Sequence, residues 1–237
     1  MVNKLTAYNQ MVQQNYLETI YSEQKTPITN YPKKLINYLI ERNQLERNQK
    51  ILELGCGRGD FLNEFIIYGL DGYGVDISDY CKKFFPNIKF QKTDLANEQL
   101  PYQDNFFDVI YSKSIIEHFY FPEKVFEEAY RVLKPGGIII TLTPEWKYIY
   151  KSFYEDFTHR TPFTSISLRD IHEMSGFKEI KVDSFKQLPI IFEERFFSKI
   201  FSFFSFLTRI LVPENFRIKN KWIRFSKEIM LLSIAKK

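Results

Sequence analysis

The fold is decided by one stretch, Ile51-Leu52-Glu53-Leu54-Gly55-Cys56-Gly57-Arg58-Gly59-Asp60. In this stretch an apolar run meets three glycines at alternate positions, and an apolar helical pattern follows from Phe61. The order predicts a strand, a tight turn and the N-terminus of a helix, because glycine tolerates the backbone angles of such a turn. Glycine also lets a ligand approach the main chain closely. The stretch therefore predicts a ligand-binding loop, with Glu53 at the carboxyl end of the strand.

Strand-like and helical segments alternate on both sides of this loop. The alternation predicts a parallel sheet with helices on both faces and a ligand at the carboxyl ends of the strands. Asp76 ends the second strand about 20 residues after the glycines, where nucleotide-binding folds place an acid that binds ribose hydroxyls. The alternative is that Asp76 only caps the following helix. The expected strands are 50–54, 72–77, 88–91, one ending near 112, 138–142, 180–185 and 229–235; the expected helices are 32–47, 59–68, 80–85, one from 122, and one from 167 to 176.

Four motifs resemble, in order and spacing, those of class I S-adenosylmethionine-dependent methyltransferases. The glycine motif alone is also found in nicotinamide-dependent dehydrogenases, which remain the alternative, but the three later motifs disfavour that class. The resemblance covers about residues 51–143. The motifs are Glu53-Leu54-Gly55-Cys56-Gly57-Arg58-Gly59, Leu100-Pro101-Tyr102-Gln103-Asp104-Asn105-Phe106-Phe107-Asp108-Val109-Ile110, Ser114-Ile115-Ile116-Glu117-His118-Phe119 and Arg131-Val132-Leu133-Lys134-Pro135-Gly136-Gly137.

The resemblance implies an α/β fold, a Rossmann-like seven-stranded sheet that is mostly parallel with its last strand antiparallel. We expect one methyltransferase domain over 1–237, since domains of this class often exceed the usual size. Its expected parts are an N-terminal helical cap (1–47), a cofactor-binding core (48–143) and an acceptor-side region (144–237) with a Phe-rich helical insertion (188–227).

The same resemblance implies that the cofactor is S-adenosyl-L-methionine. By analogy with the family, Asp94 would meet the adenine amino group and Leu95 would pack on the ring. The backbone of Cys56 would matter more than its thiol. The residues expected to bind the cofactor are Glu53, Gly55, Cys56, Gly57, Asp76, Ile77, Asp94, Leu95 and Ser112.

A shorter run, Asp156-Phe157-Thr158-His159-Arg160-Thr161-Pro162-Phe163, resembles a segment of family members that act on sugars and glycan precursors. We therefore expect methyl transfer to a sugar hydroxyl of a glycan or of its lipid-linked precursor. His159 or His118 would be the base, unless His159 only caps a loop. Asp156, Arg160 and Tyr21 are the expected acceptor contacts, and Asp156 or Arg160 could also fix the tautomer of His159. No His/Cys pair has ligand spacing, so the sequence predicts no metal site.

Two other functions stay open: a methyltransferase for a lipid or quinone, and a non-catalytic membrane- or partner-binding protein on this fold. The modest net charge of +4 does not favour a nucleic-acid partner. Two cysteines and no recognisable signal peptide favour a reducing cytoplasm.

The segment 188–212 is rich in phenylalanine and has one narrow polar stripe at helical spacing, formed by Ser198, Ser202, Ser205 and Arg209. It would cover the sheet or form a homodimer interface. Alternatively, its aromatic face and the basic residues that follow would make a peripheral contact with an anionic membrane.

Overall fold

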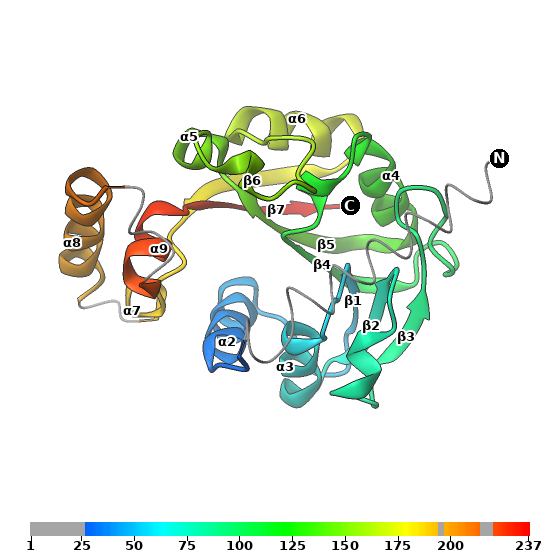
Figure 1. Cartoon of the computed structure of the whole chain (residues 1–237). Coiled ribbons are helices and arrows are strands. Elements are labelled where there is room, and N and C mark those ends of the chain that lie inside the picture. Colours follow the sequence, from blue (N-terminus) through cyan, green and yellow to red (C-terminus); the bar gives the residue numbers. More distant parts are fainter. Residues whose placement is uncertain (1–26, 194–196, 214–219) are drawn as a thin grey trace. The chain divides into compact units, whose positions relative to one another are not determined.

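The computed structural model describes residues 27–193, 197–213 and 220–237, which include a seven-stranded sheet of order β3-β2-β1-β4-β5-β7-β6 (Figure 1). The order changes direction after β1, and β7 runs antiparallel to both β5 and β6. This confirms the predicted Rossmann-like fold with its antiparallel last strand. Two compact units make up the chain: residues 1–111 with 131–137, and residues 112–130 with 138–237.

The first unit is built on three parallel strands whose register pairs Leu54 with Val75 and Val75 with Gln91. Asp108 fastens the start of β1, because its carboxylate accepts from the Lys50 amide (2.8 Å) and the Lys134 ammonium (2.6 Å). Its elements are α2 (Tyr31–Asn43), β1 (Lys50–Leu54), α3 (Asp60–Tyr68), β2 (Asp71–Asp76), the 3-10 turn η1 (Tyr80–Lys83), β3 (Lys89–Lys92) and most of β4 (Phe107–Lys113).

Helix α3 is positioned by glycines at both ends. Gly59 and Gly69 have φ of 88° and 117°, values that a residue with a side chain rarely adopts. Between them α3 buries Leu62 and Phe65. A Cβ on Gly72 would overlap Ile66, so the bare strand lets α3 pack directly on β2. The N-terminus of α3 is thereby fixed directly after the glycine loop.

In the second unit β7 lies between β5 and β6, and α6 packs on β6 and β7. A capping box starts α6: the Thr164 hydroxyl accepts from the Ser167 amide (3.2 Å) while the Ser167 hydroxyl accepts from the Thr164 amide (2.9 Å). The elements are η2 (Ile116–His118), α4 (Pro122–Val132) and β5 (Leu133–Pro144), both shared with the first unit, then α5 (Trp146–Ile149), η3 (Phe153–Glu155), α6 (Ser165–Met174), β6 (Lys178–Phe185), α7 (Pro189–Phe192), α8 (Ser198–Leu211), α9 (Lys221–Lys227) and β7 (Met230–Lys236).

Three expectations from the sequence need comment. The helix expected over 32–47 ends at Asn43, because Gln44 takes a left-handed conformation with φ of 52°. β5 begins at Leu133 rather than at 138. Tyr21 lies outside the described residues. None of the described helices has the length and hydropathy that a bilayer span requires.

Candidate cofactor and acceptor sites

The glycine loop of the first unit follows β1 with left-handed backbones at Gly55 and Gly57, whose φ values are 67° and 52°. The amides of Gly55 and Cys56 both donate to the Val75 carbonyl, at 2.9 and 3.1 Å. A Cβ on Gly57 would meet nothing within 4 Å. Neighbouring side chains therefore do not require glycine there, but the backbone angle does, and the open space suits a ligand lying against the main chain.

Asp76, at the carboxyl end of β2, is tied to this loop. One carboxylate oxygen accepts from the Gly57 amide (2.9 Å) and the other from the Ser78 amide (3.1 Å). Burial raises the pKa of Asp76, and the amide hydrogen bonds oppose that rise. Glu53 is buried at the end of β1, and Ile77 directly follows Asp76. Two buried carboxylates thus terminate neighbouring strands beside the glycine loop, in a setting that suits a cationic, hydroxyl-bearing ligand.

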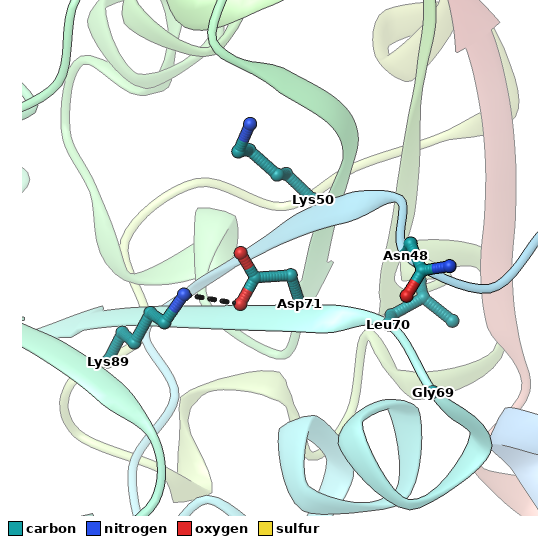
Figure 2. Close-up of a pocket in the computed structure, with 6 residues that line it drawn as sticks. All are labelled: Asn48, Lys50, Gly69, Leu70, Asp71 and Lys89. Carbon is teal, nitrogen blue, oxygen red and sulfur yellow. Dashed lines mark hydrogen bonds and ion pairs between the residues drawn. The ribbon is translucent and has the colours of Figure 1, made fainter.

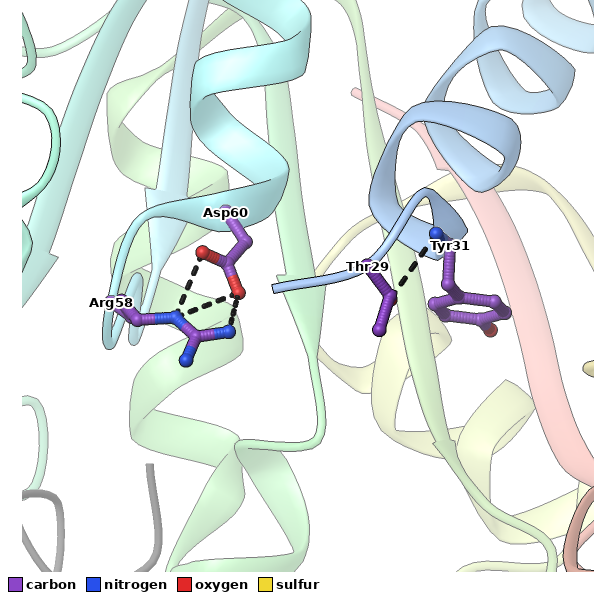
Figure 3. Close-up of polar contacts among 4 residues, drawn as sticks. All are labelled: Thr29, Tyr31, Arg58 and Asp60. Carbon is purple, nitrogen blue, oxygen red and sulfur yellow. Dashed lines mark hydrogen bonds and ion pairs between the residues drawn. The ribbon is translucent and has the colours of Figure 1, made fainter. Parts of the chain in front are cut away.

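The two variable positions of the glycine motif have structural partners. The thiols of Cys56 and Cys81 are hydrogen-bonded, and this contact and burial raise the pKa of Cys56. Arg58 is buried and binds the Asp60 carboxylate through Nε at 2.9 and 3.0 Å (Figure 3). Its guanidinium also lies over the Phe84 ring. The side chains of Cys56 and Arg58 therefore hold the glycine loop in place through these contacts.

The remaining predicted cofactor residues are placed as follows. Asp94 caps its own turn: its carboxylate accepts from the Ala96 amide (3.0 Å) and the Asn97 side chain (2.9 Å). Leu95, next to it, is half-buried. Ser112 is buried in β4, and its hydroxyl has no hydrogen-bond partner within the described part of the chain.

A pocket of about 460 Å³ lies at the opposite, amino ends of the strands in the first unit (Figure 2). Its lining includes the first residues of β1, β2 and β3, and Lys89 binds Asp71 across it at 2.6 Å. Ligands of open α/β sheets bind at the carboxyl ends of the strands instead. We therefore assign this pocket no part in the reaction. It is lined by Asn48, Lys50, Gly69, Leu70, Asp71 and Lys89.

The second unit brings together the two histidines that the sequence singled out. The rings of His118 and His159 have centroids 4.9 Å apart. Glu117, which sequence reasoning quoted in a motif but gave no role, is buried beside them. Its Oε2 accepts from the Thr143 hydroxyl at 3.0 Å, and its Oε1 has no hydrogen-bond partner among the residues described. The only advance signal was its position immediately before His118.

The loop after η3 fixes the orientation of both rings. Nδ1 of His159 lies 2.6 Å from the Phe153 carbonyl, which can only accept, so Nδ1 carries a proton and Nε2 is the acceptor of the neutral ring. The Thr158 hydroxyl donates to Asp156 (2.5 Å) and lies 2.9 Å from Nδ1 of His118. The tautomer of His159 is therefore set by Phe153 and not, as the sequence suggested, by Asp156 or Arg160. Asp156 instead reaches His118 through Thr158.

Arg160 is held by its own loop. Its guanidinium donates to the carbonyls of Phe157 (2.6 Å) and His159 (2.9 Å) and lies over the Tyr120 ring. The backbone amide of Arg160 donates to the Glu117 carbonyl at 2.8 Å. The loop is thereby fastened to η2, which keeps His159 next to Glu117 and His118.

Electrostatics in this cluster follow from burial. Burial raises the pKa of Glu117, and the nearby His159 opposes that rise. Burial lowers the pKa of His118, and Asp156 opposes that fall. Donor atoms of Glu117, His118 and His159 all lie within 4.8 Å of one another. The sequence predicted no metal site, yet the fold brings together three donors of the kinds that bind a divalent ion. Spacing along the chain could not reveal them, because His159 comes from a different segment than Glu117 and His118.

Residues 52–141 match the family model described as a methyltransferase domain. The chain belongs to the class I S-adenosylmethionine-dependent methyltransferases. This methyltransferase is 32% identical over 148 residues to the uncharacterized protein MJ1123 of Methanocaldococcus jannaschii, a match that covers 60% of the chain and 69% of that protein.

Two further comparisons show how much of the chain resembles known methyltransferases. The sterol 24-C-methyltransferase of Pneumocystis carinii is 29% identical over 145 residues, which are 56% of this chain and only 37% of that protein. The crystal structure of an S-adenosylmethionine-dependent methyltransferase from Archaeoglobus fulgidus superimposes with a TM-score of 0.64 at 23% identity, over 92% of this chain and 99% of that one. The second likeness extends the shared fold across most of the methyltransferase.

Gly57→Ala should separate cofactor binding from folding. The new Cβ meets no neighbour, so the cost to the free energy of unfolding is the left-handed backbone alone, about 1–2 kcal/mol. The methyl group would occupy the space that we assign to the cofactor, and we expect the dissociation constant for S-adenosylmethionine to rise at least about tenfold. Calorimetric titration and thermal unfolding measure the two effects. Unchanged affinity would show that the cofactor does not approach Gly57.

Proposed function

We propose that this enzyme methylates a hydroxyl oxygen of a sugar, in a glycan or a lipid-linked glycan precursor. The observation that carries the proposal is the ring of His159. Its Nδ1 donates to the Phe153 carbonyl, which leaves Nε2 as the acceptor of the neutral imidazole, and the ring lies beside the buried Glu117 carboxylate. This is the arrangement of a general base, in which a fixed neutral imidazole accepts the proton of a hydroxyl.

The chemistry asks little else of the protein. The sulfonium of S-adenosylmethionine supplies an already activated methyl group, and alignment of the two reactants can account for roughly 7–11 kcal/mol of the barrier. A neutral hydroxyl is a weak nucleophile, so removal of its proton by His159 accelerates the transfer. Glu117 would stabilise the imidazolium that results. His118, oriented by Thr158 and Asp156, is the second candidate for the same step.

We assign the cofactor to the glycine loop and its neighbours. The ionised Asp76 would accept hydrogen bonds from the ribose hydroxyls, in place of one or both amides that it binds here. Glu53 would face the cationic end of the cofactor. Asp94 and Leu95 would meet the adenine, with Gly55, Cys56, Gly57, Ile77 and Ser112 completing the site.

A lipid or quinone acceptor is the competing proposal, and the name of the sterol-methylating relative favours it. The chain spans only about a third of that protein's length, 37%, so its acceptor does not transfer directly. The sequence also left open a non-catalytic protein on this fold. The match to the methyltransferase family argues against that alternative.

An acceptor screen tests the proposal. The full chain would be incubated with S-adenosylmethionine carrying a labelled methyl group and with three acceptor sets: free oligosaccharides, polyprenyl-linked sugars, and sterols or quinols. We expect label on a sugar oxygen, stable to mild acid and base as an ether is. Label confined to a carbon, a nitrogen or a quinol oxygen would overturn the sugar assignment while leaving the methyltransferase activity intact.

A further inference from the structure

Helix α8 presents most of its large apolar side chains to solvent. It lies beside α9 at one end of the second unit (Figure 1), where it packs on α7 and α9 and its Arg209 lies over the Tyr148 ring of α5. Together with the preceding Phe197, seven aliphatic or aromatic side chains are between 46% and 71% exposed. So many large apolar side chains exposed on one helix mark an interaction surface. The seven residues, called the α8 face below, are Phe197, Ile200, Phe203, Phe204, Phe206, Ile210 and Leu211.

The polar stripe of α8 faces the protein. Ser205 is fully buried, while Nε of Arg209 donates to the Ser226 carbonyl on α9 at 3.1 Å. Nε1 of Trp222 donates to the Thr208 hydroxyl at 3.1 Å. An amphipathic helix on a globular protein turns its apolar side inward, so α8 is oriented in the opposite sense. Small hydroxyl residues between helices and apolar residues outside are typical of helices in contact with lipid.

Charge distinguishes lipid from a second copy of the chain. The sequences of α8 and α9 contain five cationic side chains and no carboxylate. Lys199 and Lys221 are exposed, and Arg224 is 58% exposed although it pairs with Glu228. Two copies meeting through this surface would bring like charges together. An anionic bilayer instead offers hydrocarbon to the α8 face and negative headgroups to the cations.

We propose that the α8 face docks on the surface of an anionic phospholipid bilayer, with α8 lying in the interface plane. A helix of 14 residues is too short to span the hydrocarbon core but suits this placement. The inference is independent of the acceptor, since it rests on the exposed side chains and the cations alone.

Vesicle flotation of the full chain tests the docking. We expect binding to vesicles of phosphatidylglycerol and phosphatidylcholine at low salt, and much weaker binding to phosphatidylcholine alone. The triple variant Phe203→Ser, Ile210→Ser, Leu211→Ser should lower the partition coefficient at least about tenfold, because three apolar side chains leave the bilayer. Lys199→Glu with Lys221→Glu should lower it by about fivefold or more for each charge, and only on anionic vesicles.

A matched control carries the same substitution at exposed apolar positions elsewhere: Ile67→Ser, Ile166→Ser and Met174→Ser, which are 68%, 71% and 81% exposed in the native chain. This variant should float like the native protein. S-adenosylmethionine titration of all variants reports that each is folded. Equal binding by the α8 and control variants would overturn the proposal. So would a dimer in light scattering that only the α8 triple variant dissociates, since that result would assign the face to a second copy.

Discussion

His159→Asn is expected to lower kcat by about 10²–10⁴-fold, the usual worth of a general base. Asparagine can still donate to the Phe153 carbonyl through its amide, at the place where Nδ1 of His159 lies 2.6 Å away. It offers no acceptor at the position of Nε2. The substitution therefore removes the proposed base and keeps the hydrogen bond that orders the loop. The dissociation constant for S-adenosylmethionine and the KM of the acceptor should change little.

His118→Asn is the matched control, because it keeps a donor toward the Thr158 hydroxyl in the same way. If His159 is the base, this variant should lose far less turnover. Added imidazole should restore part of the activity of His159→Ala, and an acceptor with a more acidic hydroxyl should be less sensitive to either change. Full turnover by His159→Asn would show that it is not the base.

Treatment with a chelator distinguishes two possible roles of this cluster: His159 as a general base, or Glu117, His118 and His159 as ligands of a metal ion. We expect activity to withstand EDTA when His159 acts with an unbound Nε2. Activity lost on chelation and restored by one divalent ion would instead make Glu117, His118 and His159 ligands, and acceptor activation would pass to the ion.

The glycine loop and the strands of the first unit could be predicted because the information that specifies them is local. An apolar run followed by Gly55, Gly57 and Gly59 leaves the chain few backbone choices, and the structure shows the expected strand, left-handed loop and helix. The motif that ends in Phe107-Asp108-Val109-Ile110 was recognised in the same way, although its physical role became visible only in the fold. The Asp108 carboxylate accepts hydrogen bonds from the Lys50 amide and the Lys134 ammonium, which precede and follow it in the sequence.

The contacts of the histidine cluster in the second unit could not be predicted in the same detail, because they join segments that are distant in the sequence. Glu117 and Thr143 are 26 residues apart, and Thr158 lies 40 residues from His118. Sequence reasoning named both histidines and gave Asp156 two possible roles, to fix the tautomer of His159 or to bind the acceptor. Nothing local reveals that Thr158 lies between Asp156 and His118. Periodicity likewise found the two faces of α8. It could not show that Ser205 would face inward, because burial of a polar stripe depends on the partners that α9 supplies.

Asp76→Asn is expected to weaken S-adenosylmethionine binding by about 10–100-fold, because hydrogen bonds from two ribose hydroxyls to a charged acceptor are worth roughly 1.5–3 kcal/mol each before compensation. The side chain keeps its size, so the loss should come from charge and acceptor capacity. Asp79→Asn is the control: it is exposed and three residues further along the chain. Unfolding curves would check that the amides of Gly57 and Ser78, which now donate to Asp76, still hold the loop.

The pH dependence of binding gives the same assignment a second test. Burial raises the pKa of Asp76 above the ordinary 3.8. Only the ionised form accepts from both hydroxyls, so affinity is complete above that raised pKa and falls as the pH drops through it. Binding favours the ionised form, so calorimetry in buffers of different ionisation enthalpy should detect proton release in this range. In Asp76→Asn the acidic loss of affinity should disappear. If the variant still loses affinity at acidic pH as the native protein does, another carboxylate is titrating, and that carboxylate would be the one that binds the ribose.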